Sequence, residues 1–165
     1  MKEILTILFN KYNISYDENK LNKLEKFYNI VLKQNEVMNL TNITEKNEFA
    51  IKNILDSVLP INAFPQNAYV VDVGAGAGFP SIPLKILRPD LKIVMIDSLN
   101  KRVKFLNDTT LALKLSDIQA VHIRAEDFSA NNREKADVVI AGGADIASDT
   151  VLLGFDSLEA VDHDR

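Results

Sequence analysis

The sequence predicts an α/β fold in which a helical N-terminal segment precedes a parallel sheet, on three observations. Residues 1–66 keep the three-to-four-residue apolar spacing of amphipathic helices. From residue 68, short β-branched runs alternate with helical stretches, which is typical of right-handed βαβ units. The first of these runs ends in an acid and three alternate glycines, at 72–78. We therefore expect a helical cap at 1–66, a ligand-binding core at 67–141 and an acidic C-terminal segment at 142–165.

The N-terminal segment is expected to form three helices. Apolar residues between Ile4 and Phe9 mark one face of a short first helix. Asp17 is a suitable N-cap for a second helix, whose apolar stripe runs from Leu21 to Met38. The run N-L-T-N at 39–42 breaks this stripe with turn-forming residues, and a third helix, at about 45–59, ends before a proline.

The core is expected to contain four strands with helices between the first three. The strands are expected at 68–73, 91–96, 118–123 and 137–141, and the helices at 80–87 and about 100–114. Because ligands of parallel sheets lie beyond the carboxyl ends of the strands, the residues that follow each strand are candidates for a site. After residue 141 the pattern weakens: 149–161 could form a helix, and no further strand is expected. The fourth strand would then be an unpaired edge of the sheet.

The glycine-rich loop indicates a nucleoside cofactor. Gly74, Gly76 and Gly78 let the backbone turn sharply and approach a ligand with no Cβ in the way. The second strand ends at Asp97, nineteen residues after Gly78, where a carboxylate can bind both hydroxyls of a ribose. The G-x-G-x-G spacing differs from that of dinucleotide binders, and Asp72 would repel a phosphate but could hold a cationic amino group. S-adenosylmethionine therefore fits better than NAD; the alternative is a tight turn that binds nothing.

Charged residues after the second and third strands are further candidates. Lys101 and Arg102 lie in the first turn of an expected helix, where the macrodipole disfavours cations. They could contact a phosphate backbone, although a solvated basic face explains them equally well. After the third strand we expect Ala125 and Glu126 near an adenine ring and Arg124 turned toward a substrate. The alternative there is a local surface ion pair, which would contribute little.

Composition excludes several kinds of site. The chain has no cysteine, which excludes disulfides, thiolate metal sites and a cysteine nucleophile. Its two histidines, His122 and His163, are too isolated for a metal centre. No apolar run approaches the roughly 18–20 residues of a membrane span, and the N-terminus lacks a signal-peptide block. We therefore expect a cytoplasmic protein with no metal.

Several motifs, taken together and in order, resemble the bacterial small-subunit ribosomal RNA guanine-N7 methyltransferase family, RsmG or glucose-inhibited division protein B. The resemblance covers about residues 1–141. The motifs are N-L-T at 39–41, I-L-D-S at 54–57, V-D-V-G-A-G-A-G-F-P at 71–80, I-P-L at 82–84, R-P at 88–89, D-S-L-N-K-R at 97–102 and R-A-E-D at 124–127. The combination of D-S-L-N-K-R with G-x-G-x-G-F-P is specific to that family.

The resemblance implies a class I, Rossmann-like methyltransferase fold with a helical cap, and methyl transfer to N7 of a guanine in 16S ribosomal RNA. It implies that S-adenosylmethionine binds to Gly74, Phe79, Asp97 and the pair Ala125 and Glu126. Among the matched residues, Asp56 and Arg124 are the candidates for catalysis. Guanine N7 has an in-plane lone pair and no proton, so orientation can supply most of the catalysis without a general base. The expected partner is the ribosomal RNA or the small ribosomal subunit.

The chain departs from the family pattern in three places. Asn53 stands where the family usually has His, Ser81 stands where it has Gly, and Gly142-Gly143 replaces an Arg-Ala pair. Residues 1–135 carry a net charge of +2 and residues 136–165 carry −6. We therefore expect a truncated, frameshifted or engineered C-terminus and an incomplete sheet. Alternative functions are a catalytically silent protein that binds S-adenosylmethionine and a methyltransferase for a non-RNA substrate.

Overall fold

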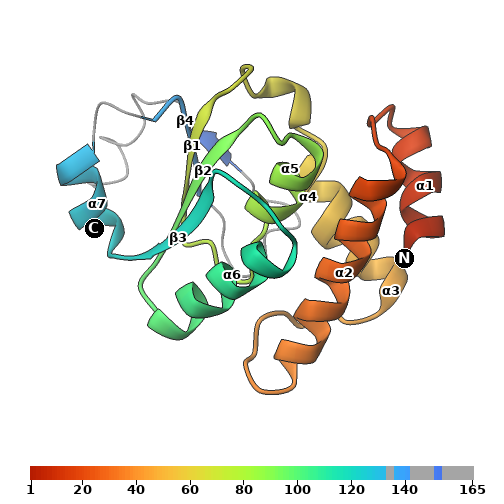
Figure 1. Ribbon diagram of the computed structural model, residues 1–165, viewed down its shortest axis with the longest axis horizontal. Helices are drawn as coiled ribbons and strands as arrows, with labels where there is room; N and C mark the ends of the chain where they lie inside the picture. Colours follow the sequence, from red (N-terminus) through yellow and green to blue (C-terminus); the bar gives the residue numbers. More distant parts are fainter. Residues whose placement is uncertain (133–135, 142–150, 154–165) are drawn as a thin grey trace.

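In the computed structural model, which describes residues 1–132, 136–141 and 151–153, the centre is a five-stranded sheet (Figure 1). The strand order is β3-β2-β1-β4-β5, and β1 to β4 run parallel. The strands are β1 (Tyr69–Val73), β2 (Lys92–Asp97), β3 (Ile118–His122), β4 (Val138–Ala141) and β5 (Val151–Leu153). The four expected strands are confirmed, with ends that differ by one residue at most.

The expectations for the chain after residue 141 were wrong in two respects. β5 is a strand within the segment expected to be helical, and it pairs antiparallel with β4. β4 therefore has partners on both sides and is not an edge of the sheet. A three-residue strand has too short a pattern to be recognised alone, because its conformation depends on the backbone groups of the neighbouring strand. The rest of 142–165 lies outside the described residues.

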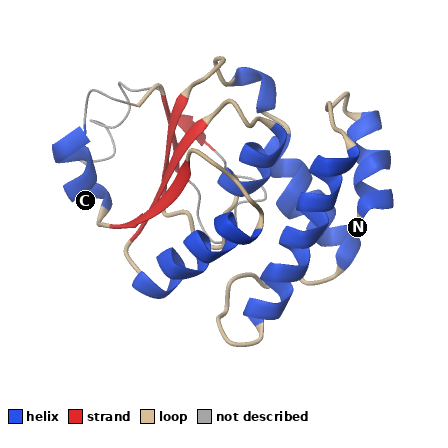
Figure 2. Cartoon of the chain, in the orientation of Figure 1, coloured by secondary structure: helices blue, strands red, loops and turns tan. Residues whose placement is uncertain are grey.

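The helices of the core lie on both faces of the sheet (Figures 1 and 2). The connections from β1 to β2 and from β2 to β3 move in one direction along the sheet, so right-handed crossovers place α5 (Ser81–Leu87) and α6 (Asn100–Ala112) on the same face. The connection from β3 to β4 moves back across the sheet, and its helix α7 (Ala125–Asn132) lies on the other face. This topology brings the loops after β1, β2 and β3 to one end of the sheet.

The helices that precede β1, which we call the cap, pack against α5. The elements of the cap are α1 (Lys2–Lys11), α2 (Glu18–Asn35), α3 (Lys46–Glu48), η1 (Phe49–Leu55), α4 (Asp56–Val58) and η2 (Ile61–Ala63). The side chain of Asp17 accepts a hydrogen bond from the Lys20 N–H at 2.8 Å, which confirms the expected N-cap of α2.

The expected third helix, at 45–59, is not a single α-helix. Its centre is η1, a π-helix in which the Asp56 N–H donates to the carbonyl of Ile51. The Ser57 hydroxyl donates to the carbonyl of Asn53 at 2.5 Å, so a side-chain hydrogen bond also contributes to the last turn of this helix. Over so few turns, the apolar spacing fits either kind of helix, and the sequence could not distinguish them.

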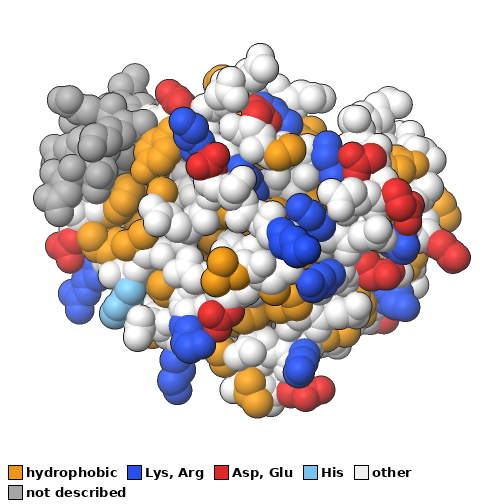
Figure 3. Space-filling view, viewed as in Figure 1, with side chains coloured by type: hydrophobic (Ala, Val, Ile, Leu, Met, Phe, Trp, Pro, Cys, Tyr) orange, Lys and Arg blue, Asp and Glu red, His pale blue; other side chains and the backbone are white. Residues whose placement is uncertain are grey.

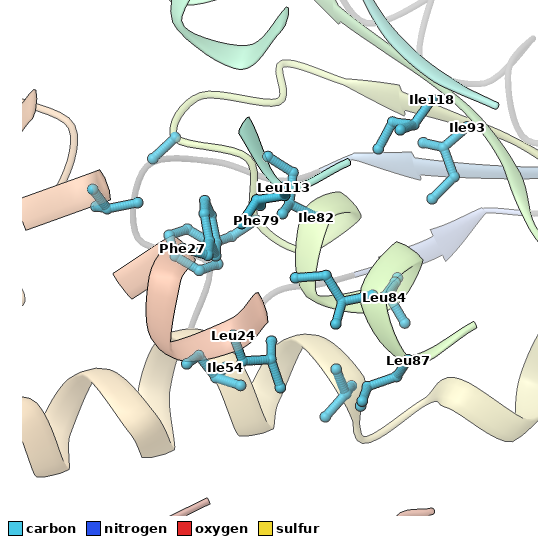
Figure 4. Close-up of a cluster of buried hydrophobic side chains, with 14 of the residues drawn as sticks. Leu24, Phe27, Ile54, Phe79, Ile82, Leu84, Leu87, Ile93, Leu113 and Ile118 are labelled. Atoms are coloured by element: carbon cyan, nitrogen blue, oxygen red, sulfur yellow. The ribbon is translucent and has the colours of Figure 1, made fainter. Parts of the chain in front are cut away.

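Aromatic packing joins the cap to the glycine loop. The ring of Phe79 lies 5.2 Å from that of Phe27 in α2 and 5.6 Å from that of Phe49 in η1, measured between centroids. Figure 4 shows Phe27 and Phe79 side by side, with Leu24 and Ile54 nearby in the same buried cluster. Burial of rings in this way contributes strongly to stability. The cap is therefore anchored on the loop that follows β1.

No helix in the described part of the chain is both long and apolar enough to cross a bilayer.

Candidate functional site

The carboxyl ends of three strands meet, as the topology requires. The N–H groups of Gly74 and Ala75, after β1, donate to the carbonyl of Ile96 in β2 at 2.9 and 3.2 Å. The Ile123 N–H, after β3, donates to the carbonyl of Asp97 at 3.2 Å. The glycine loop, the end of β2 and the start of the β3–α7 connection are thus adjacent, where parallel sheets bind ligands.

Asp97 organises two of these segments. Its Oδ2 accepts from the Gly76 N–H at 3.1 Å, and its Oδ1 accepts from the Leu99 N–H at 2.9 Å. The guanidinium of Arg102 lies 3.7 Å from Oδ2. A carboxylate has about four lone-pair positions, so the two backbone bonds leave capacity for ligand hydroxyls. The sequence predicted the position of Asp97 at the strand end, but not its bond to the glycine loop.

The glycines of the loop have different surroundings. All three have positive φ values, of 73°, 57° and 99° for Gly74, Gly76 and Gly78. A Cβ on Gly76 would meet only the carbonyl oxygen of Gly74, at 4.0 Å, so a ligand has room to approach there. A Cβ on Gly78 would lie 2.7 Å from Cδ1 of Ile82 and 3.1 Å from Cδ2 of Leu106. The absence of a side chain at Gly78 therefore lets α5 and α6 pack closely against the loop, and Gly78 does not leave open space for a ligand.

Gly78→Ala is expected to lower the free energy of unfolding by about 2 kcal/mol, through backbone strain and contact with two buried side chains. Gly76→Ala is the matched control, because its φ of 57° lies in the left-handed α region and its Cβ would meet no atom closer than 4.0 Å. It should cost about 1 kcal/mol. Urea denaturation of both variants measures the difference, and equal losses would contradict the packing role of Gly78.

Asp72, expected to hold a cationic amino group, lies beneath the loop and is fully buried. Its Oδ2 accepts from the Ser81 hydroxyl at 2.5 Å, and within the described residues its Oδ1 has no hydrogen-bond partner. Burial raises the pKa of Asp72 to about 7, with a further contribution from the nearby charge of Asp97, while the bond from Ser81 acts in the opposite direction. This carboxyl is therefore enclosed in the core and does not line the cavity on the cap side of the loop.

That cavity lies between the cap and the glycine loop. From the cap it is lined by residues 39–41 and by Lys52, Asn53 and Ser57, and from the core by residues 74–77, Phe79 and Arg102. By themselves, the polar residues at 39–41 indicated only a turn between helices, and nothing local to 52–57 indicated a cavity. Their place in motifs shared with a known family was the signal that could have identified them as cavity residues.

Asn35, at the end of α2, holds the cap side of this cavity in place. Its Oδ1 accepts from the N–H groups of Leu40 and Thr41 at 2.8 and 3.1 Å, and its Nδ2 donates to the Thr41 carbonyl at 3.0 Å. Three bonds from one amide fix the path of the loop that follows α2. No pattern in the sequence indicated this role for Asn35.

The other candidate residues are dispersed around this end of the sheet. Asp56 lies in α4, where burial raises its pKa, and unlike Asn53 and Ser57 it does not line the cavity. Arg124 is exposed between β3 and α7, and Ala125 and Glu126 begin α7. Lys101 is exposed in the first turn of α6, next to the cavity-lining Arg102.

No group of three His, Asp or Glu side chains in the described residues is placed to hold a metal ion.

Comparison with known families gives one match over most of the chain. A family model described as rRNA small subunit methyltransferase G matches residues 20–146. A protein named ribosomal RNA small subunit methyltransferase G from Desulforamulus reducens is 48% identical, and the match covers 75% of this chain and 53% of the relative. A protein of the same name from Clostridium kluyveri is 38% identical, and the match covers 93% of this chain and 65% of the relative. The chain thus spans between about half and two thirds of the length of these relatives.

Comparison with solved structures addresses the fold. A Plasmodium falciparum protein assigned as a protein-L-isoaspartate O-methyltransferase, solved with S-adenosyl-L-homocysteine, matches with a TM-score of 0.54 and 15% identity over 86% of this chain and 72% of that one. A Staphylococcus aureus protein assigned as a caffeoyl-CoA O-methyltransferase matches with a TM-score of 0.50 and 11% identity. That match covers 82% of this chain and 58% of the Staphylococcus aureus chain. These likenesses confirm the expected class I methyltransferase fold, and at such low identity they show the fold alone.

Proposed function

We propose a function from one premise: this chain belongs to the rRNA small subunit methyltransferase G family. The proposed function is transfer of a methyl group from S-adenosylmethionine to N7 of a guanine in 16S ribosomal RNA. The observation that carries it, beside the family, is the junction of the glycine loop and Asp97 at the ends of adjacent parallel strands. Since ribosomal RNA is the proposed substrate, we place the protein in the cytoplasm.

The cofactor fits the residues at this junction. Open space at Gly76 allows close approach to the loop backbone, and Asp97 retains acceptor capacity for ribose hydroxyls. Gly74, which follows β1, and Ala125, the first residue of α7, complete the proposed binding surface. S-adenosylmethionine supplies an activated methyl group when it is bound.

The chain's own residues are proposed to bind and orient the two reactants. The cap wall at 39–41 and Asn53 face the loop across the cavity, so a base could be held between the cap and the core. Because guanine N7 carries no proton, this orientation is the main requirement of the reaction. Arg124 is the proposed substrate contact and Asp56 a proposed catalytic residue of the cap. The proposed division is a cap at 1–66 and a cofactor-binding core at 67–141.

The direct test is incubation of the purified chain with radiolabelled S-adenosylmethionine and small ribosomal subunits that lack the modification. We expect label in 16S RNA at N7 of guanine, located by cleavage at the modified base. A parallel incubation with a cell extract tests other substrates. Label in protein or in small molecules of that extract, with none in RNA, would contradict the proposed substrate.

A second candidate is a catalytically silent protein that binds S-adenosylmethionine. It is favoured by Gly142-Gly143, which stands where the family has Arg-Ala and lies outside the described residues. Calorimetric titration with S-adenosylhomocysteine, combined with the methyl-transfer assay described above, separates the two candidates. Binding without methyl transfer to any RNA supports the silent protein, whereas binding with transfer excludes it.

Lys101→Ala is expected to weaken binding of a guanine-containing RNA oligonucleotide by about threefold to fivefold at low salt, because an exposed cation contributes through counterion release. The affinity for S-adenosylhomocysteine should not change. Lys104→Ala is the matched control, since this exposed lysine lies on the same helix and pairs with Asp108 at 2.8 Å. Equal effects of the two variants, in fluorescence anisotropy, would contradict a specific role for Lys101.

A further inference from the structure

The cavity between the cap and the glycine loop has a positive lining. Lys52 of η1 contributes one cation from the cap, and Arg102 of α6 contributes another from the core. Among the described residues that line the cavity there is no Asp or Glu, although the whole chain has a formal charge of −4. A concave surface with charge of one sign concentrates ligands of the opposite sign. The charge of this cavity therefore favours an anionic group.

Both cations have partners that a ligand could replace or share. Lys52 Nζ lies 2.7 Å from Glu48 Oε1, but the two side chains are 50% and 43% exposed, and exposed pairs of this kind contribute little. Arg102 lies 3.7 Å from Asp97, whose two oxygens already accept backbone N–H groups. A guanidinium has five N–H donors, so this long contact leaves most of them for a ligand.

Neutral polar groups complete the lining of the cavity. Asn39 and Thr41 line the cap side, and Asn35 fixes the backbone that carries them. On the core side, the backbone of Gly76 and Ala77 lines the cavity without a bulky side chain. Such a wall can supply uncharged hydrogen bonds to the oxygens of an anion while Lys52 and Arg102 supply the charge.

We propose that Lys52 and Arg102 form an anion site that holds a phosphate of the target nucleotide. The amino and sulfonium groups of S-adenosylmethionine are cations, which these side chains would repel. Its carboxylate is the other source of anionic oxygens. The phosphate is favoured because Lys52 is half exposed and Arg102 more than a third exposed, so a polymer can reach both from solvent. Figure 3 shows Lys and Arg side chains at several places on one face of the molecule, with Asp and Glu side chains among them.

This inference rests on the proposed function for the identity of the phosphate, but the anion site can be tested without methyl transfer. The probes are guanosine 5′-monophosphate, guanosine and S-adenosylhomocysteine, titrated by NMR or calorimetry, and a single-stranded RNA oligonucleotide containing guanine, titrated by anisotropy. The variants are Lys52→Gln and, as the matched control, Lys46→Gln, an exposed lysine of α3 that does not line the cavity.

Lys52→Gln is expected to weaken binding of the monophosphate and the oligonucleotide about fivefold at low salt, because one phosphate contact is lost. The slope of log affinity against log salt for the oligonucleotide should decrease in magnitude by about 0.7. Affinities for guanosine and S-adenosylhomocysteine should not change, and Lys46→Gln should resemble the wild type. Glu48→Gln, which releases Lys52 from its ion pair, should bind the monophosphate as tightly as the wild type or more tightly.

Three results would overturn the proposal. The wild type could bind guanosine and its monophosphate equally well. Lys52→Gln could weaken S-adenosylhomocysteine and leave the monophosphate unchanged, which would assign the site to the carboxylate of the cofactor. The two lysine variants could also behave alike. Failure of the proposed function is distinct: Lys52-dependent binding of the monophosphate without methyl transfer to RNA would support the anion site and count against the enzyme activity alone.

Discussion

Asp97→Ala is expected to weaken binding of S-adenosylhomocysteine by at least 100-fold, a larger loss of ligand affinity than any other single substitution in the site should cause. Two hydrogen bonds from ribose hydroxyls to a carboxylate would be lost, and bonds to charged groups contribute about 1.5–3 kcal/mol each. The glycine loop would also lose the acceptor for the Gly76 N–H. Calorimetric titration with S-adenosylhomocysteine measures the first effect.

The same variant should lower the free energy of unfolding by about 1–3 kcal/mol, because the N–H groups of Gly76 and Leu99 would lose their acceptor. Urea denaturation therefore accompanies the titration and establishes that the variant is folded at the temperature used. Asp108→Ala is the matched control on α6: its side chain is 62% exposed and forms a surface ion pair with Lys104. It should leave both measurements nearly unchanged. A folded Asp97→Ala variant that binds within threefold of the wild type would contradict the proposed ribose contact.

Asp72→Asn is expected to change the pH dependence of stability more than any other substitution. Burial raises the pKa of Asp72 from 3.8 to about 7 in the folded protein, so the folded state binds more protons than the unfolded chain between these values. The stability that Asp72 contributes is fully present below pH 4 and is lost as the pH rises through 7. Across this window the loss is about 4 kcal/mol, at about 1.4 kcal/mol for each pKa unit.

Asparagine has the shape of the protonated carboxyl and its Oδ1 can accept from the Ser81 hydroxyl, but it does not titrate. The variant should therefore gain stability relative to the wild type as the pH is raised from 5 to 8. Urea denaturation at pH 5, 6, 7 and 8 measures this difference. Asp108→Asn, on the exposed face of α6, should follow the wild type at each pH. If the difference in free energy of unfolding between the wild type and Asp72→Asn is the same at every pH, the carboxyl titrates near its ordinary pKa.

Much of the fold could be predicted because its signals are local. Two examples are the β-branched run followed by glycine in β1 and the helix N-cap at Asp17. Each depends on residues within a few positions of one another. The position of Asp97 beside the glycine loop followed from one further rule, that neighbouring parallel strands end at the same edge of the sheet. β5 and the π-helix η1 were not predicted, because strand pairing and small changes in helix width leave little trace in short sequences.

The sequence by itself determined the order of strands and helices, the glycine loop and the acid at the end of β2, since each depends on residue type and spacing along the chain. Only the tertiary structure decided that Asp72 is enclosed beneath the loop and that the cap supplies Lys52 and Asn53 to a cavity shared with the core. These features arise when segments far apart in sequence pack together, as Phe27 and Phe49 do on Phe79. Burial, and the pKa shift that burial causes, are properties of that packing and have no local pattern.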